Sequence, residues 1–272
     1  MYERFFGMKN TPFAKDVPVS ALYESPAMAD ALGRLTYTAD RQLFAVVTAD
    51  AGCGKSTLIR KLDDSLPKDQ YLLLYLSDSK LTPRWFYKGL LDRIGVESRF
   101  YRGDAKRQLQ REIEIIRGVH RQKVVCVLDE AHLLEKETIE EFRFLLNYRF
   151  DSMSPLALIL VGQTELWDEK LRLRRYAAVR QRIDINCVLP PLDRAETGKY
   201  IQSHLDYAQC GQEIFTSRAV DEVFKVSSGI LRSINRVCEK SLMYASQQGH
   251  RLVDDHVVSF VAEHEMLKGG EQ

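Results

Sequence analysis

A short segment of small residues carries the side chains best suited to binding phosphate. It reads Ala49-Asp-Ala-Gly-Cys-Gly-Lys-Ser56, after an apolar run and before a helical pattern. The backbone N–H groups of such a turn wrap an anion, and the N-terminus of the following helix favours negative charge. Lys55 is expected to reach the β- and γ-phosphates of ATP, and the Ser56 hydroxyl to bind Mg²⁺. The residues expected to hold the nucleotide are Ala49, Asp50, Ala51, Gly52, Cys53, Gly54, Lys55, Ser56 and Thr57.

Two acidic residues follow a second apolar run, 124–128. If that run is a buried parallel strand, Asp129 and Glu130 stand at the sheet edge where ligands bind. Asp129 is expected to hold Mg²⁺ through its waters, and Glu130 to orient an attacking water. Taken alone, the pair fits a solvated strand end better, but in register with the phosphate-binding segment it predicts ATP hydrolysis. Gln163 follows a third apolar run, either as an ordinary loop residue or as a sensor of the γ-phosphate.

Strand-length apolar runs alternate with helical patterns between residues 43 and 189. The runs are nearly continuous in apolar character, as expected of strands that are buried on both faces. This alternation predicts an α/β P-loop fold with a parallel five-stranded sheet flanked by helices. The expected strands are 43–48, 71–76, 124–128, 156–161 and 183–189, and the helices between them include 55–66, 83–94 and 138–148.

The strand pattern stops after Pro190-Pro191, and helical segments follow at 196–208, 217–227, 230–248 and 254–265. Thr216 or Ser217, and Asp254, are the expected N-caps. These segments predict a small all-helical lid. The predicted division is 1–42 as the N-terminal segment of the ATPase module, 43–191 as its core, 192–266 as the lid and 267–272 as a flexible tail.

The composition narrows the class of protein. The chain has 272 residues, 45 % of them hydrophobic, which is enough for a full core. No apolar run approaches the roughly 18 residues that a membrane span needs, and the N-terminus lacks the layout of a signal peptide. Five widely spaced cysteines without a Cys-x-x-Cys pair fit the reduced thiols of a cytoplasmic protein with no membrane partner.

Together these motifs resemble the AAA+ ATPases, and more narrowly the ExeA-like group, which includes transposon-encoded ATPases related to TnsC, MuB and IstB. The resemblance is carried, in this order, by Phe5-Phe-Gly-Met-Lys-Asn-Thr-Pro-Phe13, Leu128-Asp-Glu-Ala-His132, Leu160-Val-Gly-Gln163, Arg180-Gln-Arg-Ile183 and Gly229-Ile-Leu-Arg232. Two positions depart from the pattern. Ala49 replaces the usual first glycine of the phosphate-binding segment, and Leu231 replaces a common proline.

The resemblance implies roles for further residues. Gln163 would be the first sensor, and Arg232 the second sensor, contacting the γ-phosphate of its own subunit. Arg180 or Arg182 would be the arginine finger, offered to the ATP of a neighbouring subunit, although solvated surface arginines are the simpler alternative. A finger that acts between subunits implies a homo-oligomer, a ring or helical filament, in which ATP binding and assembly are linked.

Two basic clusters stand out in a chain whose net charge is +1: 170–182 has no acidic residue, and 99–123 has eight basic residues against three acids. Such clusters can follow nucleic-acid phosphates, although solvated helix faces are the common alternative. Aromatic residues nearby could stack on bases, namely Trp85, Phe86, Tyr87, Phe100 and Tyr101. By resemblance to transposition ATPases, double-stranded DNA would meet residues after the second strand, here Lys80, Arg84, Lys88, Arg99, Arg102 and Lys106.

The leading hypothesis is an ATP-dependent DNA-binding regulator of transposition. It would oligomerise on double-stranded DNA and recruit or activate a transposase, and ATP hydrolysis would drive its disassembly. One alternative is an ExeA-like ATPase that assists assembly of a secretion system. A nucleotide-dependent scaffold without turnover and a helicase-loader-like protein are further alternatives. The pair Asp129 and Glu130, beside Lys55 and Ser56, favours an enzyme over the scaffold.

Overall fold

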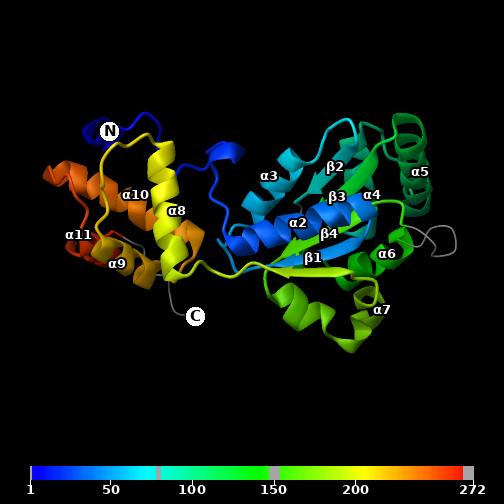
Figure 1. Cartoon of the computed structure of the whole chain (residues 1–272). Coiled ribbons are helices and arrows are strands. Elements are labelled where there is room, and N and C mark those ends of the chain that lie inside the picture. The colour runs from blue at the N-terminus through cyan, green and yellow to red at the C-terminus, as the bar shows by residue number, and fades with distance from the viewer. Residues whose placement is uncertain (1, 78–80, 147–153, 266–272) are drawn as a thin grey trace. The chain divides into compact units, whose positions relative to one another are not determined.

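Five aliphatic runs form one parallel sheet in the computed structural model, which describes residues 2–77, 81–146 and 154–265. The strand order is β2-β3-β4-β1-β5 (Figure 1). The inner strands β1, β3 and β4 are buried almost throughout, which explains why their sequences are nearly continuous in apolar character. The predicted five-stranded parallel sheet is confirmed. The strands are β1 (Phe44–Thr48), β2 (Tyr71–Leu76), β3 (Lys123–Leu128), β4 (Ala157–Gly162) and β5 (Ile185–Val188).

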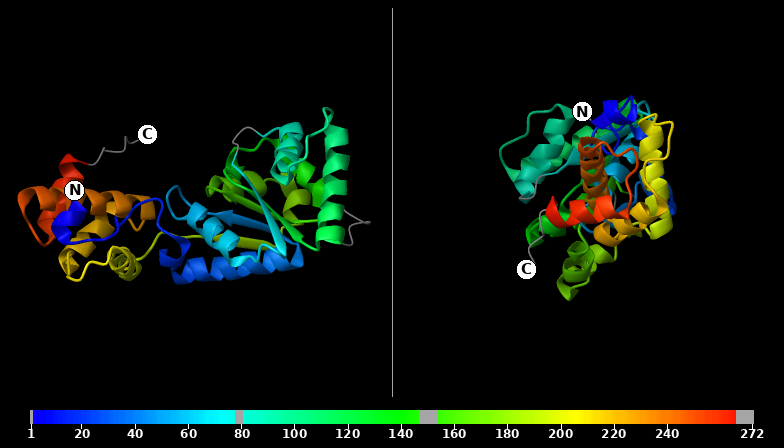
Figure 2. Two further views of the ribbon diagram at one scale, coloured as in Figure 1. Left: turned by 90° about the horizontal axis from the view of Figure 1, so that it is seen from above. Right: turned by 90° about the vertical axis from the view of Figure 1, so that its left-hand side faces the viewer.

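The strand order decides which helices share a face of the sheet. The step from β1 to β2 crosses the sheet in one direction, and the later steps cross it in the other. Because crossovers are right-handed, α3 lies on one face and the helices that follow β2, β3 and β4 lie on the opposite face. Leu90, Leu109 and Phe142 from three of those later helices pack in one core. Figure 2 shows the ribbon of these elements from two further sides. The helices of this region are α2 (Pro26–Arg41), α3 (Lys55–Ser65), α4 (Pro83–Ile94), α5 (Arg102–Ile115), α6 (Lys136–Leu146) and α7 (Ala177–Arg180).

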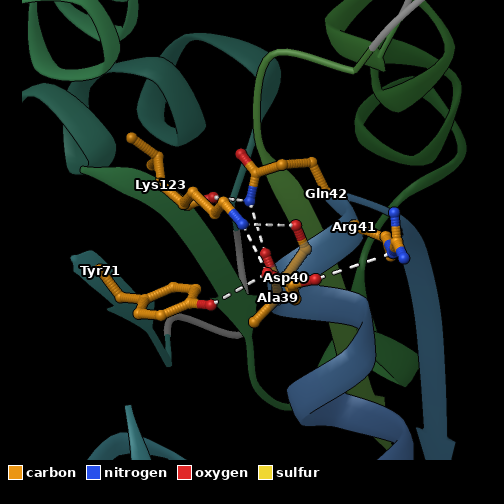
Figure 3. A network of polar contacts seen from close by, with 7 residues as sticks. Ala39, Asp40, Arg41, Gln42, Tyr71 and Lys123 are labelled. Atoms are coloured by element: carbon orange, nitrogen blue, oxygen red, sulfur yellow. Dashed lines mark hydrogen bonds and ion pairs between the residues drawn. The ribbon is translucent and has the colours of Figure 1, made fainter. Parts of the chain in front are cut away.

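A polar network ties the end of α2 to the starts of β2 and β3 (Figure 3). Asp40 accepts hydrogen bonds from the ammonium of Lys123 and from the hydroxyl of Tyr71, the latter at 3.4 Å. Gln42, which has a left-handed backbone at φ 55°, donates to two backbone carbonyls at 2.8 and 3.3 Å. The hydrogen bond from Lys123 holds the pKa of Asp40 below its usual value. The network fixes the edge of the sheet where these parallel strands begin, opposite the edge where ligands bind.

The C-terminal part of the chain is helical, as predicted. Three of its four helices begin at side-chain caps. Thr216 accepts a hydrogen bond from the Ala219 N–H, and Asp254 accepts one from the Val257 N–H. Asp193 and Glu196 form a reciprocal capping box at the first helix. The helices are α8 (Arg194–Tyr207), α9 (Ser217–Ser227), α10 (Leu231–Gln248) and α11 (Asp255–His264). The predicted flexible tail, 267–272, lies outside the described residues.

Contacts divide the chain into two compact units. The ATPase unit comprises 27–51 and 55–189, and the helical unit comprises 1–26, 52–54 and 190–272. Residues 1–26, which include α1 (Tyr2–Phe6), join the helical unit because their apolar side chains pack in its core. Phe13 stacks on His204, with ring centroids 5.0 Å apart, and its N–H donates to Nδ1 of His204 at 3.2 Å. The segment predicted as 1–42 is therefore divided at Pro26.

Candidate functional site

The phosphate-binding segment leaves β1 and enters α3 at Lys55, as the sequence predicts. Gly52 and Gly54 have φ values of +88° and +95°, a left-handed region that favours glycine. Ala49 is not among the described non-glycine residues with positive φ, so alanine fits this position without strain. The ammonium of Lys55 is buried and donates to the carbonyls of Ala49 and Asp50 at 2.7 and 3.0 Å. The segment therefore curls around its own lysine.

Asp129 follows β3 directly and is buried. Its Oδ2 accepts a hydrogen bond from the Tyr75 hydroxyl at 2.6 Å, and its Oδ1 accepts one from the Glu130 N–H at 2.8 Å. Burial, helped by the hydrogen bond to Asp129, raises the pKa of Tyr75, so this hydroxyl stays a neutral donor. The carboxylate of Asp129 is therefore fixed by both of its oxygens. Tyr75 had no predicted role, although its place in an otherwise leucine-rich strand was a usable signal.

Glu130 has a left-handed backbone, with φ 55° and ψ 31°. For a residue other than glycine this conformation costs on the order of 1 kcal/mol or more, and such residues concentrate at functional sites. The hydrogen bond from its N–H to Asp129 helps to hold the turn. The turn separates the directions of the two side chains, because Asp129 is buried whereas the Glu130 side chain is 43 % exposed.

Gln163 and His132 contact each other by both backbone and side chain. The Gln163 N–H donates to Nδ1 of His132 at 3.3 Å, and the amide nitrogen of the Gln163 side chain lies 3.0 Å from Nε2 of the same ring. Nε2 of His132 also lies 3.6 Å from Oε2 of Glu130. The His132 side chain is only 10 % exposed. His132 belongs to the predicted motif, but no role of its own was predicted for it.

The strand order brings these residues to one edge of the sheet. β4 lies between β3 and β1, and the register pairs Leu128 with Leu160 and Thr48 with Gly162. The residues that follow the three strands therefore leave the sheet side by side. A hydrogen bond of 3.3 Å from the Thr164 hydroxyl to Asp50 joins two of these loops.

The three predicted arginines differ in their surroundings. Arg180 donates to the carbonyls of Leu171 and Arg172 at 3.1 and 2.6 Å, and Arg182 donates to the carbonyl of Ala178 at 3.2 Å. Both guanidiniums thus bond to backbone close to them in sequence.

Arg232 lies in the helical unit, which also contains residues 52–54. Its N–H donates to the Gly52 carbonyl at 3.2 Å. A Cβ on Gly52 would lie 2.9 Å from Cβ of Arg232, so this close approach requires glycine.

One solvent-exposed group of residues on α4 and the loop before α5 combines cations with aromatic rings. We call it the basic–aromatic surface; it consists of Arg84, Trp85, Lys88, Phe100 and Tyr101. The guanidinium of Arg84 lies 4.2 Å from the Phe100 ring centroid, and the ammonium of Lys88 lies 4.8 Å from that of Trp85. The three rings are 49–71 % exposed. In the described part of the chain, neither cation forms an ion pair.

The other residues predicted around this surface have different surroundings. The prediction that Phe86 and Tyr87 are available to bases is wrong: both are fully buried, because they occupy the core-facing side of α4. The Tyr87 hydroxyl donates to Glu141 at 2.6 Å, and Lys106 and Arg102 approach the same carboxylate at 3.0 and 3.5 Å. Burial disfavours the Glu141 charge, but these donors outweigh it and lower the pKa of Glu141.

Two predicted DNA contacts remain. The backbone N–H of Arg99 donates to Gln108 at 2.9 Å, which holds the loop before α5 against that helix. Lys80 lies outside the described residues.

The predicted Mg²⁺ ligands fit that ion. No cluster of three or more His, Cys, Asp or Glu residues with metal-binding geometry occurs among the described residues. Mg²⁺ in nucleotide sites is commonly held by one or two protein oxygens, the phosphates and water rather than by an all-protein cage. The exposed Ser56 hydroxyl and the Asp129 carboxylate provide such oxygens. Within residues 2–77, 81–146 and 154–265, no helix is long and apolar enough to cross a membrane.

Comparison with known proteins shows which family and which fold this chain resembles. Residues 38–169 match a family model described as an AAA domain. The chain is 31 % identical over 261 residues to general secretion pathway protein A of Aeromonas hydrophila. That match covers 93 % of this chain but 46 % of the relative, so the chain spans less than half of that protein.

Solved structures agree on the fold. Cdc6p from Pyrobaculum aerophilum has a TM-score of 0.72 at 15 % identity, over 95 % of this chain and 71 % of that one. The Aeropyrum pernix ORC1 protein in complex with DNA has a TM-score of 0.66 at 15 % identity, over 92 % of this chain and 68 % of that one. At these identities the structures show the fold alone. The narrower resemblance to TnsC, MuB and IstB stays a prediction, whereas residues 38–169 match the AAA domain model and the chain has the P-loop AAA+ fold.

Proposed function

We propose that this chain binds ATP with Mg²⁺ and hydrolyses the ATP to ADP and phosphate. The observation that carries the proposal is the grouping of Lys55, Asp129, Glu130 and Gln163 at the ends of three neighbouring strands. A P-loop with one acid for the metal and a second acid for water is the set that nucleotide hydrolysis needs. The AAA domain match supports the same chemistry.

Each residue has a defined task in this proposal. Lys55 exchanges its two loop carbonyls for oxygens of the β- and γ-phosphates. Ser56 and Asp129 hold the Mg²⁺, which offsets phosphate charge when bound. Glu130 orients the attacking water and draws its proton, and Gln163 donates to the γ-phosphate. Since Tyr75 and a backbone N–H already fix Asp129, little reorganisation is needed when the metal binds.

We further propose that the ATP site is completed in a homo-oligomer, either a ring or a filament. Arg180 or Arg182 would supply a guanidinium to a neighbouring subunit, after releasing the backbone carbonyls that it now contacts. Arg232, whose N–H bonds to Gly52, would report the nucleotide within its own subunit. A ligand that binds only the assembled state stabilises assembly, so ATP and oligomerisation would be linked.

Assistance in assembling a secretion system is the biological role that the comparisons favour. The relative named general secretion pathway protein A aligns with nearly the whole of this chain. Because the chain spans less than half of that protein, any partners that this chain would have in secretion are themselves proposals. None of the five cysteines, all of which lie among the described residues, forms a disulfide bond, which supports a reducing compartment such as the cytoplasm.

ATP-dependent binding of double-stranded DNA, with regulation of a transposase, is the second candidate. The basic–aromatic surface supports it, since unpaired cations attract phosphates and exposed rings can stack on bases. Arg84 and Lys88 are the best-placed contacts, because Arg102 and Lys106 already approach Glu141.

Turnover and assembly of matched variants test the proposal. We expect wild type to hydrolyse ATP, and Glu130→Gln to lose about a hundredfold or more in kcat while it still binds ATP and assembles. Glu169→Gln, at an exposed acid outside the site, should behave like wild type. If wild type shows no turnover with or without DNA, and Glu130→Gln matches it, the chain is a scaffold. Filaments seen by electron microscopy only with ATP and duplex DNA would favour transposition; assembly indifferent to DNA would favour secretion.

A further inference from the structure

His132 lies between the two side chains that the proposed function assigns to the water and the γ-phosphate. Its Nε2 is 3.6 Å from Oε2 of Glu130 and 3.0 Å from the Gln163 amide. The ring is held in a short helical turn, Ala131–Leu133, between β3 and α6. None of the tasks proposed above uses this ring, although it is almost fully buried at the edge of the site.

The hydrogen bonds fix the tautomer of the ring. Nδ1 accepts the backbone N–H of Gln163 at 3.3 Å, so it carries no proton. In a neutral imidazole the proton is then on Nε2, which must act as a donor. Two N–H donors cannot bond to each other. In the structure the Gln163 amide nitrogen occupies this contact. Because the oxygen and nitrogen of an amide are assigned from their partners, the donor at Nε2 assigns this position to the amide oxygen instead.

This orientation has a consequence for Gln163. With the amide oxygen bonded to His132, the NH₂ group is directed away from the ring and is available as a donor. An amide of the opposite orientation would present an acceptor to the γ-phosphate, which repels an anion. The same Nε2–H faces the Glu130 carboxylate, whose left-handed backbone needs support from its neighbours.

We propose that His132 is a positioning residue for hydrolysis: its Nε2–H orients the Gln163 amide and restrains the Glu130 carboxylate. The inference rests on the proposed ATPase function. In this role His132 acts on the side chains of Glu130 and Gln163, and not directly on ATP or the attacking water. Its loss should therefore lower kcat and leave ATP binding intact, since positioning acts on the reacting geometry.

Two substitutions separate the two ring nitrogens. His132→Gln places an amide N–H near the position of Nε2, and His132→Asn places an amide oxygen near that of Nδ1. We expect His132→Asn to lower kcat by about tenfold to a hundredfold, with the Kd for a fluorescent ATP analogue unchanged within about twofold. We expect His132→Gln to keep most of the wild-type kcat, in contrast to His132→Asn. A purely structural role would make the two variants alike in kcat and in thermal stability.

A double-mutant cycle keeps the test independent of folding. If His132 acts through Gln163, the kcat loss of His132→Asn combined with Gln163→Ala should be no larger than that of Gln163→Ala alone. Full additivity, or a His132→Asn variant with wild-type kcat, would overturn the inference while wild-type turnover leaves the ATPase proposal standing. Absence of turnover in wild type would instead refute the proposed function. His250→Asn, at an exposed histidine of the helical unit, is the matched control and should change nothing.

Discussion

The hydroxyl of Tyr75 donates a hydrogen bond to Oδ2 of Asp129 at 2.6 Å, from the strand adjacent to the one that Asp129 follows. The contact matters because Asp129 is the acid expected to hold Mg²⁺, and the orientation of such a ligand depends on the groups behind it. A neighbouring strand, fixed by its own backbone ladder, is a rigid support for this purpose.

Removing that hydroxyl should weaken metal binding. We expect Tyr75→Phe to raise the Mg²⁺ concentration for half-maximal ATPase activity by about tenfold, because loss of an outer-shell partner typically costs this much metal affinity. Tyr71→Phe is the matched control, since Tyr71 lies on the same strand and contacts Asp40 at the other end. Equal Mg²⁺ dependence of the two variants would refute the role of Tyr75.

Gly229 should be intolerant of a side chain. Its φ is +76°, and an added Cβ would lie 1.9 Å from the carbonyl oxygen of Leu192. We expect Gly229→Ala to lower the free energy of unfolding of the helical unit by about 3 kcal/mol or more. Gly249 has nearly the same φ, +75°, with open space around it. Gly249→Ala should therefore cost only about 1 kcal/mol, and denaturant unfolding followed by circular dichroism distinguishes the two. Equal losses would mean that backbone strain, not the close approach to Leu192, decides the cost.

Acid should destabilise the helical unit through His204. Burial lowers the pKa of His204 to about 4, from 6.5. His204 therefore binds a proton more readily in the unfolded chain than in the folded one. Its protonation leaves the free energy of unfolding unchanged above pH 6.5 and lowers it as the pH falls toward 4. The full loss is of order 3 kcal/mol. His204→Asn, which places an amide oxygen near the position of Nδ1 and can still accept the Phe13 N–H, should flatten this part of the pH dependence.

Urea unfolding at several pH values between these limits measures the effect. His250→Asn removes an exposed histidine from the same unit and serves as the control. If His204→Asn and wild type lose stability in parallel on acidification, His204 is not the group responsible.

The basic–aromatic surface can be tested with intrinsic fluorescence. The chain has two tryptophans, so Trp167→Phe leaves Trp85 as the only one. We expect duplex DNA with ATP to quench Trp85 emission in this background. Arg84→Ala should weaken binding and reduce the slope of log affinity against log salt by about one, since one phosphate contact is lost.

Arg218→Ala, at an exposed arginine of the helical unit, should leave both quantities unchanged. Trp85 emission that is indifferent to duplex and single-stranded DNA would remove this surface from the DNA hypothesis.

The fold was largely predictable because its signals are local. Each strand is a short apolar run, and three of the four helices α8 to α11 have a capping residue, such as Thr216 or Asp254, at their start. The order of the strands in the sheet was not predicted, nor was the packing of residues 1–26 in the helical unit. These depend on contacts between segments far apart in sequence, for example Phe13 with His204.

The motif residues of the candidate site could be predicted from the sequence, but the residues that hold them in place could not. Lys55, Asp129 and Glu130 have a recognisable spacing, whereas Tyr75 and His132 act through side chains that meet only in the folded sheet. The same limit explains the error at Phe86 and Tyr87. They are adjacent to the exposed Trp85 in sequence, but the helical period turns them toward the core.

The packing of residues 1–26 against α8 has a consequence for how the chain folds during synthesis. This segment leaves the ribosome before the residues that it packs against, because His204 follows Phe13 by 191 residues. All five strands lie between them and can pair in the meantime. The apolar side chains of this segment, Tyr2, Phe6 and Phe13, therefore stay exposed to solvent until the C-terminal helices have been synthesised. Contacts between residues so far apart in sequence form slowly. In a nascent chain whose synthesis stops near residue 190, residues 1–26 should expose apolar side chains that favour aggregation. Chaperones that recognise short apolar segments should bind these residues.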